Sequence, residues 1–259
     1  MDKRLEDYPH LEKLAIEGYD FNISDYISKG LDIFKRDIGG FVGFTIVYFL
    51  IMMAASFIPL GSTIISPALS IGWAIVCYNI VRNQHREFNE FFKGFDDFVQ
   101  LLLVTIISGL IMTAALIPLG IVAFTSFDMG EVFLGGEPDF GNVSVTTLVI
   151  GTLAFMIPLI YIGVAWIWAP YFVVFYKMQF WDAMEASRKI IGRNWWIYFL
   201  FLIVLVLINI LGILGFGIGL LFTIPATMCM QYIAFAKVTG LHREIEEGGY
   251  NPIEDHLVG

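Results

Sequence analysis

Four basic residues near the middle of the chain could bind an anion. They lie just before a long apolar run, and they are Lys177, Arg188, Lys189 and Arg193. A basic side chain beside the cytoplasmic leaflet contributes about 1 kcal/mol to the binding of anionic lipid. These residues are therefore candidate contacts for an anionic headgroup. The alternative is that they only fix the orientation of the chain in a membrane, because two carboxylates in the same stretch dilute the positive charge.

The elements that must position these charges are an amphipathic helix and the apolar run behind it. Apolar residues from Phe180 to Ile191 fall mainly on one helical stripe, which predicts a helix lying on the membrane surface. Glu185 is spaced to pair with Lys189, and Gly192 is placed to end the helix. Three tryptophans are expected to anchor the stretch at the interface, namely Trp181, Trp195 and Trp196.

The rest of the sequence offers little chemistry. Its four histidines are far apart, no HExxH or CxxC pattern occurs, and the acidic loop near 126–142 lacks the spacing of a calcium-binding loop. We therefore expect no metal, no cofactor and no catalytic residue. Cys77 and Cys229 lie in apolar runs, where they are interpreted as small hydrophobic side chains. A net charge of −9 argues against a nucleic-acid partner.

Composition places the chain in a membrane. Hydrophobic residues make up 58% of it and charged residues only 15%, against about 25% charged in a soluble domain. Four stretches lack any ionisable residue, and their lengths hold six spans of about 20 residues. The predicted fold is an all-α integral membrane protein with six transmembrane helices arranged as three hairpins. The spans are expected near 38–60, 64–82, 98–124, 145–176, 195–214 and 217–238.

The basic residues also predict an orientation. With six spans, all 15 Lys and Arg residues fall in or beside the segments on one side of the membrane. By the positive-inside rule both termini are then cytoplasmic, and the expected location is the cell (inner) membrane. The domain plan is a cytoplasmic N-terminal segment with an amphipathic helix over 1–37, a transmembrane domain over 38–238 and a short cytoplasmic tail over 239–259.

The segments that precede the hairpins resemble one another. Lys29-Gly-Leu-Asp-Ile-Phe34 matches Lys93-Gly-Phe-Asp-Asp-Phe98, and 34–38 loosely matches 191–195. Each second span of a pair also carries proline. We interpret these matches as three copies of one unit, each an amphipathic helix followed by a hairpin.

The C-terminal part of the chain, about 169–238, resembles a group of bacterial membrane proteins, and Phe91-Phe-Lys-Gly-Phe-Asp-Asp-Phe resembles an element of the group's first half. The resemblance rests on Ala169-Pro-Tyr-Phe-Val-Val-Phe, Ala183-Met-Glu-Ala-Ser-Arg-Lys and Gly192-Arg-Asn-Trp-Trp, followed by a long apolar pair. The group comprises uncharacterised multi-pass proteins, including YciC-like proteins and the membrane domain fused to some glycerophosphodiester phosphodiesterases. The resemblance implies a helical inner-membrane protein and supplies no catalytic residue. Phosphodiesterase activity is not expected, because the residues after Lys237 are too few for such a domain.

Three functions remain open from the sequence. The first is a non-enzymatic membrane protein that binds or organises lipid or a membrane partner. The alternative is a passive or partner-driven transporter component, since prolines can break helices around a substrate site, although more often they only kink a span. Apart from Arg82 and Lys237 at span ends, the spans hold no Asp, Glu, Lys, Arg or His, so ion coupling is not expected. A lipid-modifying enzyme comes third. The expected partners are membrane lipids, with a membrane protein or a second copy of the chain also compatible. Asn209 and Gln231 are expected to face each other across the last hairpin.

Overall fold

A computed structural model describes residues 4–84, 87–126, 145–215 and 217–242, and every element within them is a helix. The predicted acidic loop, except Ser126, and the tail beyond residue 242 lie outside the described residues. The elements before the second helix pair are η1 Leu5–Asp7, α1 Pro9–Glu17, α2 Ile23–Arg36, α3 Ile38–Ala55, α4 Gly61–Ser70, α5 Gly72–Val81 and η2 Phe88–Asp97. The remaining helices are α6 Phe98–Ser126, α8 Val145–Ala165, α9 Ala169–Tyr176, α10 Phe180–Arg193, α11 Trp195–Leu214 and α12 Leu220–Thr239.

Six of the described stretches are long and apolar enough to cross a membrane, which confirms the predicted fold class. They are Ile38–Ala55, Gly61–Val81, Phe88–Ile117, Met156–Tyr176, Trp195–Leu214 and Leu220–Thr239. Consecutive stretches contact each other in pairs: α3 with α4, α6 with α8, and α11 with α12. We call the first helix of each pair the leading span and the second the returning span.

Two of the three returning spans are broken. The first divides at Ile71 into α4 and α5, and the second divides at 166–168 into α8 and α9. Proline lies beside each break, as Pro67 within α4 and Pro170 in the first turn of α9. Proline removes a backbone donor and crowds the preceding turn, so a break nearby is expected. The third returning span, α12, continues through Pro225.

The segment that precedes each pair packs on the returning span of the pair before it. Thus α2 packs on α12, η2 packs on α4 and α5, and α10 packs on α8 and α9. These three seams close a ring, because the first segment lies on the last span. The segments themselves differ: α2 and α10 are α-helices, whereas η2 is wound as a 3₁₀ helix. Its Gly-x-Asp-Asp sequence consists of weak α-helix formers, which fits that winding.

Small residues at matching positions bring the seams together. A Cβ on Gly30 of α2 would stand 2.6 Å from the backbone nitrogen of Met230, and a Cβ on Gly94 of η2 would overlap the carbonyl oxygen of Ala68. Gly30 and Gly94 are equivalent in the Lys-Gly match. The 34–38 match to 191–195 makes Ser187 of α10 the third equivalent. At this position each of the three matching segments therefore has a small residue that lies against the returning span of the preceding pair.

The third seam uses a hydroxyl where the other two use glycine. Ser187 is fully buried, and its Oγ donates a hydrogen bond of 2.6 Å to the carbonyl of Ala165. It also accepts one of 3.1 Å from the amide of Trp168. Both groups lie at the break between α8 and α9, where intrahelical partners are lost. Ser187 thus satisfies backbone polar groups that burial would otherwise leave unpaired.

The returning spans form the interior of the ring. Of their most apolar 18-residue stretches, 72%, 44% and 61% are buried, against 22%, 11% and 22% for the leading spans. The rings of Tyr78, Phe175 and Tyr232 meet there with centroids 5.5 and 5.7 Å apart. The Sγ atoms of the fully buried Cys77 and Cys229 lie 2.9 Å apart, and both cysteines are free. Large aromatic side chains therefore fill the space between these three spans.

The polar contact across the last pair differs from the prediction. The Asn209 amide donates to the Thr227 hydroxyl (3.1 Å), and Gln231 instead lies 3.4 Å from the hydroxyl of Tyr198. An interhelical hydrogen bond is therefore present, but the predicted pair was wrong. Thr227 and Gln231 lie one turn apart on the same face of α12. The Asn209 side chain of α11 lies level with Thr227 and therefore bonds to Thr227 instead of Gln231.

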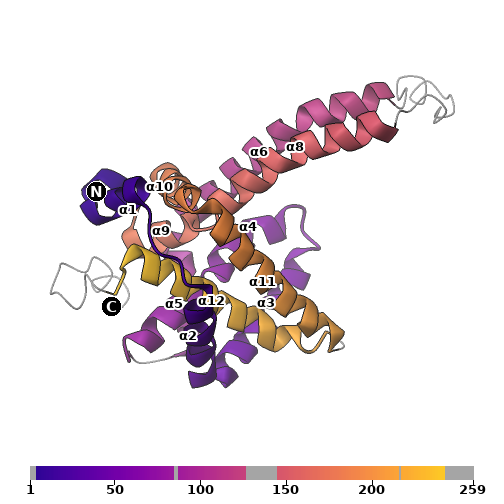
Figure 1. Cartoon of the computed structure of the whole chain (residues 1–259). Helices are drawn as coiled ribbons and strands as arrows, with labels where there is room; N and C mark the ends of the chain where they lie inside the picture. Colours follow the sequence, from indigo (N-terminus) through magenta and orange to yellow (C-terminus); the bar gives the residue numbers. More distant parts are fainter. Residues whose placement is uncertain (1–3, 85–86, 127–144, 216, 243–259) are drawn as a thin grey trace.

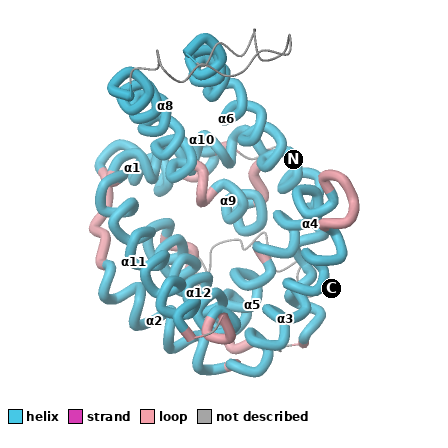
Figure 2. The backbone as a smooth tube through the Cα atoms, turned by 90° about the vertical axis from the view of Figure 1, so that its right-hand side faces the viewer, coloured by secondary structure: helices cyan, strands magenta, loops and turns pink. Residues whose placement is uncertain are grey.

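The second pair projects from the rest of the molecule. Figure 1 shows α6 and α8 running side by side to the upper right, while α11 runs from α10 to the lower right. In Figure 2 α9 lies near the middle, with α10, α4, α5, α12 and α11 around it. Both views show α8 and α11 diverging from the neighbourhood of α10. The side chains between these diverging helices matter for the candidate site.

Candidate functional site

The four predicted basic residues do not form one patch. Lys177 ends α9 in a left-handed conformation, and its Nζ lies 2.7 Å from Asp97 Oδ2 at the end of η2. Both side chains are about four-fifths buried, with 21% and 18% exposure. Lys177 therefore joins two segments of the fold, and its charge is matched within the chain.

Arg188 and Lys189 share one carboxylate. Arg188 donates two hydrogen bonds of 2.8 and 2.7 Å to Glu185, and Lys189 lies 3.5 Å from the same side chain. The paired Arg188 guanidinium lowers the pKa of Glu185 below its ordinary value, with Lys189 adding to the effect. The expected contact of Glu185 with Lys189 is confirmed, but Arg188 is the closer partner.

Arg193 lies in a different setting, beside an open groove. The groove has a volume of about 530 Å³ and lies where α8, α10 and α11 come together. It is lined by Ile157, Tyr161, Gly192, Arg193, Asn194, Trp195, Trp196 and Ile197. None of these lining residues is acidic. Within the described part of the chain, no carboxylate forms an ion pair with Arg193. We call this feature the Arg193 groove.

The aromatic side chains divide between the wall of the groove and the surface. Trp195 donates from Nε1 to the carbonyl of Tyr161 (3.3 Å) and stacks on Phe199 with centroids 4.9 Å apart. Trp196 is 73% exposed beside it. Trp181, at the other end of α10, is 56% exposed and is not among the lining residues. An exposed indole next to a basic residue is typical of the membrane interface.

Gly192 lies within α10 and does not end the helix. The helix α10 continues to Arg193, so the prediction that Gly192 terminates it was wrong. A Cβ at Gly192 would stand 3.4 Å from the hydroxyl oxygen of Tyr161, an ordinary van der Waals contact. The Tyr161 side chain of α8 therefore reaches α10 beside this glycine.

The first turn of α11 is open toward the groove. Asn194 occupies the N-cap position, where asparagine usually accepts from backbone amides of the first turn. Here its Nδ2 donates instead to the carbonyl of Tyr19, and among the described residues no side-chain hydrogen bond caps α11. At the matching position before α3, Asp37 does cap, accepting from the Gly40 amide at 3.0 Å. The α11 terminus therefore keeps unsatisfied donors next to Arg193.

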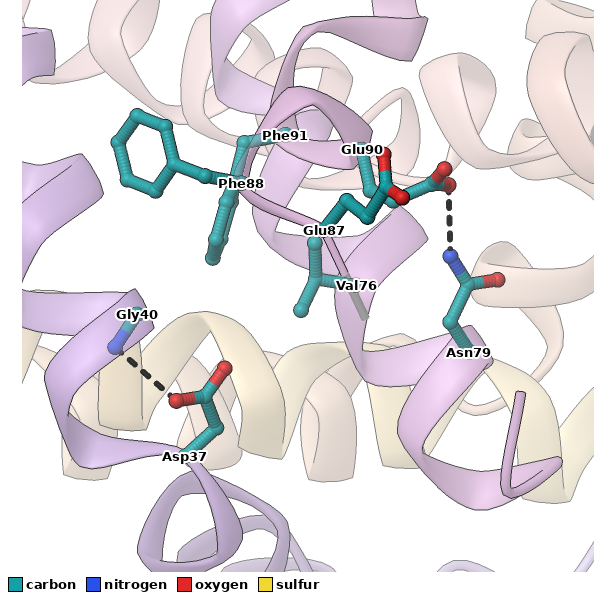
Figure 3. Close-up of a pocket in the computed structure, with 8 residues that line it drawn as sticks. All are labelled: Asp37, Gly40, Val76, Asn79, Glu87, Phe88, Glu90 and Phe91. Atoms are coloured by element: carbon teal, nitrogen blue, oxygen red, sulfur yellow. Dashed lines mark hydrogen bonds between the residues drawn. The ribbon is translucent and has the colours of Figure 1, made fainter. Parts of the chain in front are cut away.

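A second, smaller pocket has the opposite charge. Figure 3 shows Asp37, Glu87 and Glu90 around a space of about 200 Å³, with phenylalanine rings on one side. Its carboxylates already have partners in the fold: Asp37 caps α3, and Glu90 accepts from Asn79 at 2.9 Å and lies 3.1 Å from Lys93. This pocket disfavours an anion. Across the described residues, no three His, Cys, Asp or Glu side chains are placed to hold a metal ion.

Of the predicted residues, the structure brings Arg193, Trp195 and Trp196 to the groove, while Lys177, Arg188, Lys189 and Trp181 are not among its lining residues. Sequence reasoning missed Tyr161 and Asn194. Tyr161 lies in a charge-free run, where its hydroxyl gives no sign of a distant partner. Asn194 stands directly before the apolar run of α11, and asparagine is common at the N-cap of a helix. That position marks Asn194 in the sequence as a residue at a helix terminus.

Comparisons with known proteins place the chain in a family. The model of the family described as "Protein of unknown function (DUF975)" matches residues 31–242. Searches of curated proteins and of solved structures found no match. The match bears out an uncharacterised family but does not confirm the YciC-like resemblance, and nothing supports the glycerophosphodiester phosphodiesterase link. Because the match covers most of the chain, the protein belongs to the DUF975 family of proteins of unknown function.

Proposed function

We propose that this protein is a non-enzymatic integral membrane protein that binds membrane lipid in the Arg193 groove. The observation that carries the proposal is the groove itself. It joins the Arg193 guanidinium, which forms no ion pair with a carboxylate of the described residues, to exposed apolar and aromatic side chains at the point where α10 meets the spans. A phospholipid carries complementary groups in the same order, first a charged phosphate and then hydrocarbon chains.

We further propose that the α10 side of the molecule faces the cytoplasm, with both termini on that side. All 15 Lys and Arg residues support this orientation. In Figure 1 the two ends of the described chain lie on the left, and the α6–α8 tip lies at the far right. The Arg193 groove would then meet the cytoplasmic leaflet of the inner membrane.

The transporter alternative draws support from the breaks in two returning spans. However, those spans meet through packed rings, and Trp73, Phe172 and Tyr232 between them are almost fully buried. A solute path through this interior would have to displace several aromatic side chains. The Arg193 groove is already open, so a lipid can bind there without displacing these aromatic side chains.

The test compares lipid retention by the full chain and two tryptophan variants. After mild detergent purification, native mass spectrometry should show phospholipid bound to the wild type. Trp196→Ala should retain clearly less, because it removes an exposed wall of the groove. Trp181→Ala is the matched control, since it removes an exposed tryptophan outside the groove and should retain lipid as the wild type does. A wild type without lipid, or equal retention by both variants, would contradict the proposal.

A further inference from the structure

The Arg193 groove has the charge of a site for a single anion. Its lining holds one permanent cation, the Arg193 guanidinium, and no carboxylate. Arg188 and Lys189, the neighbouring cations of α10, share the Glu185 carboxylate and are not among the residues that line the groove. One unmatched positive charge is complementary to one phosphodiester, which carries a single negative charge.

Arg193 is also held in place by the chain. A Cβ on Gly18 would stand 3.3 Å from its Cγ, so the Arg193 stem lies against the turn between α1 and α2. Gly18 has a positive φ of 84°, a conformation that favours glycine. The same turn supplies the Tyr19 carbonyl that accepts from Asn194. The N-terminal segment thus positions both residues at the entry to α11.

Diverting Asn194 leaves the positive end of a 20-residue helix without a cap beside that guanidinium. Helix N-termini favour anions, because their first amides lack partners and the helix dipole is positive there. The contrast with α3 is informative, since Asp37 closes that terminus with a carboxylate. The α3 terminus repels an anion, and the α11 terminus attracts one.

The space beyond the charge is apolar and leads out of the molecule. The side chains of Ile157 from α8 and of Trp196 from α11 are 66% and 73% exposed at the groove. Away from α10 the helices α8 and α11 diverge in both views (Figures 1 and 2). Leu153 on α8 and Leu207 on α11 are likewise more than half exposed. An acyl chain that starts at the groove can therefore run outward without displacing any packed side chain.

We propose that the groove holds one anionic phospholipid, with its phosphodiester on Arg193 and the first turn of α11 and its acyl chains between α8 and α11. This inference rests on the proposed function and specifies the lipid that the site selects. Asn194 is a positioning residue, because it leaves the helix terminus open without contacting the lipid itself.

The test measures headgroup selectivity. The full chain, purified in detergent, is titrated with phosphatidylglycerol or phosphatidylcholine of identical acyl chains, and bound lipid is counted by native mass spectrometry. The wild type should favour phosphatidylglycerol by about fivefold or more, the effect of one basic residue near a charged headgroup. Arg193→Gln should abolish that preference, and Arg193→Lys should keep most of it. Asn194→Asp should also reduce it, because an aspartate there adds negative charge and can cap α11.

Arg36→Gln is the matched control. Arg36 occupies the position before α3 that matches Arg193, next to the capping Asp37, and its loss should leave selectivity unchanged. A phosphatidylglycerol preference that survives Arg193→Gln would overturn the inference. Lipid bound by the wild type without any preference would also overturn it while leaving the proposed function standing. Absence of bound lipid would remove both.

Discussion

The seam between α2 and α12 allows a quantitative prediction for Gly30→Ala. A Cβ at Gly30 would come within 3.0 Å of three atoms of Met230, two of them backbone atoms that cannot rotate away. Overpacking of this kind costs about 1–3 kcal/mol, and backbone contact places it at the upper end. Alanine regains up to about 1 kcal/mol of helix propensity, so the net loss of stability is about 2 kcal/mol. For a chain of this size that lowers the midpoint of thermal unfolding by about 4–8 °C.

The assay is thermal unfolding of the detergent-purified protein, followed by loss of the monodisperse peak in size-exclusion chromatography. Gly39→Ala is the matched control, because nothing lies within 4 Å of its Cβ position and its midpoint should stay or rise. Gly94→Ala should behave like Gly30→Ala, since its Cβ would meet the backbone of α4. A Gly30→Ala midpoint equal to or above that of the wild type would refute close backbone packing at this seam.

Three further predictions address other parts of the chain. Ser187→Ala should lower stability by about 1–3 kcal/mol in the same assay, because it leaves the Trp168 amide and one carbonyl buried without partners. Burial, together with nearby cations, lowers the pKa of His242 from 6.5 to about 4. Between these two pH values His242 is protonated in the unfolded chain and neutral in the folded chain. Stability should therefore fall by up to about 1.4 kcal/mol per unit as pH drops from 6.5 toward 4, and His242→Asn should flatten that slope. Single cysteines at Ser56 and Lys189, both exposed, should react with impermeant reagents from opposite sides of the membrane.

A specific result would contradict each of these three predictions. An unchanged Ser187→Ala midpoint would mean that the break between α8 and α9 needs no outside partner. A wild-type pH slope that survives His242→Asn would assign the effect to another group. Labelling of both cysteines from one side would contradict the proposed orientation. The native Cys77 and Cys229 are fully buried and should add little background.

The apolar spans were readable from the sequence, because they depend on composition along the chain. The span predicted at 195–214 coincides with α11, since Asn194 precedes it and glycines follow it. The match of 34–38 to 191–195 stops short of Gly30 and Ser187, and their common packing role is visible only in the structure.

Contacts between distant segments were not readable. Lys177 was a candidate contact for an anionic headgroup, yet it pairs with Asp97, 80 residues earlier. Nothing in either local sequence marks the other residue as a partner. Such pairs depend on how each helix is rotated about its axis and how deeply it sits in the membrane. An apolar run specifies neither the rotation nor the depth. The Arg193 groove has the same origin, because Tyr161 of α8 and Trp195 of α11 meet there although 34 residues separate them in the sequence.

The closed ring also sets an order for assembly during synthesis. The helix α2 is made near the beginning, whereas α12, on which it packs, is made last. About 200 residues separate Gly30 from Met230. At roughly 5–20 residues per second, the apolar face of α2 waits about 10–40 s for its partner. During that interval Tyr26, Ile33 and Phe34 can pack on early-made neighbours such as Phe21 and Phe41, but the side of α2 that faces α12 stays uncovered. A nascent chain halted before α12 should therefore expose this face, and completion of the last span should protect it.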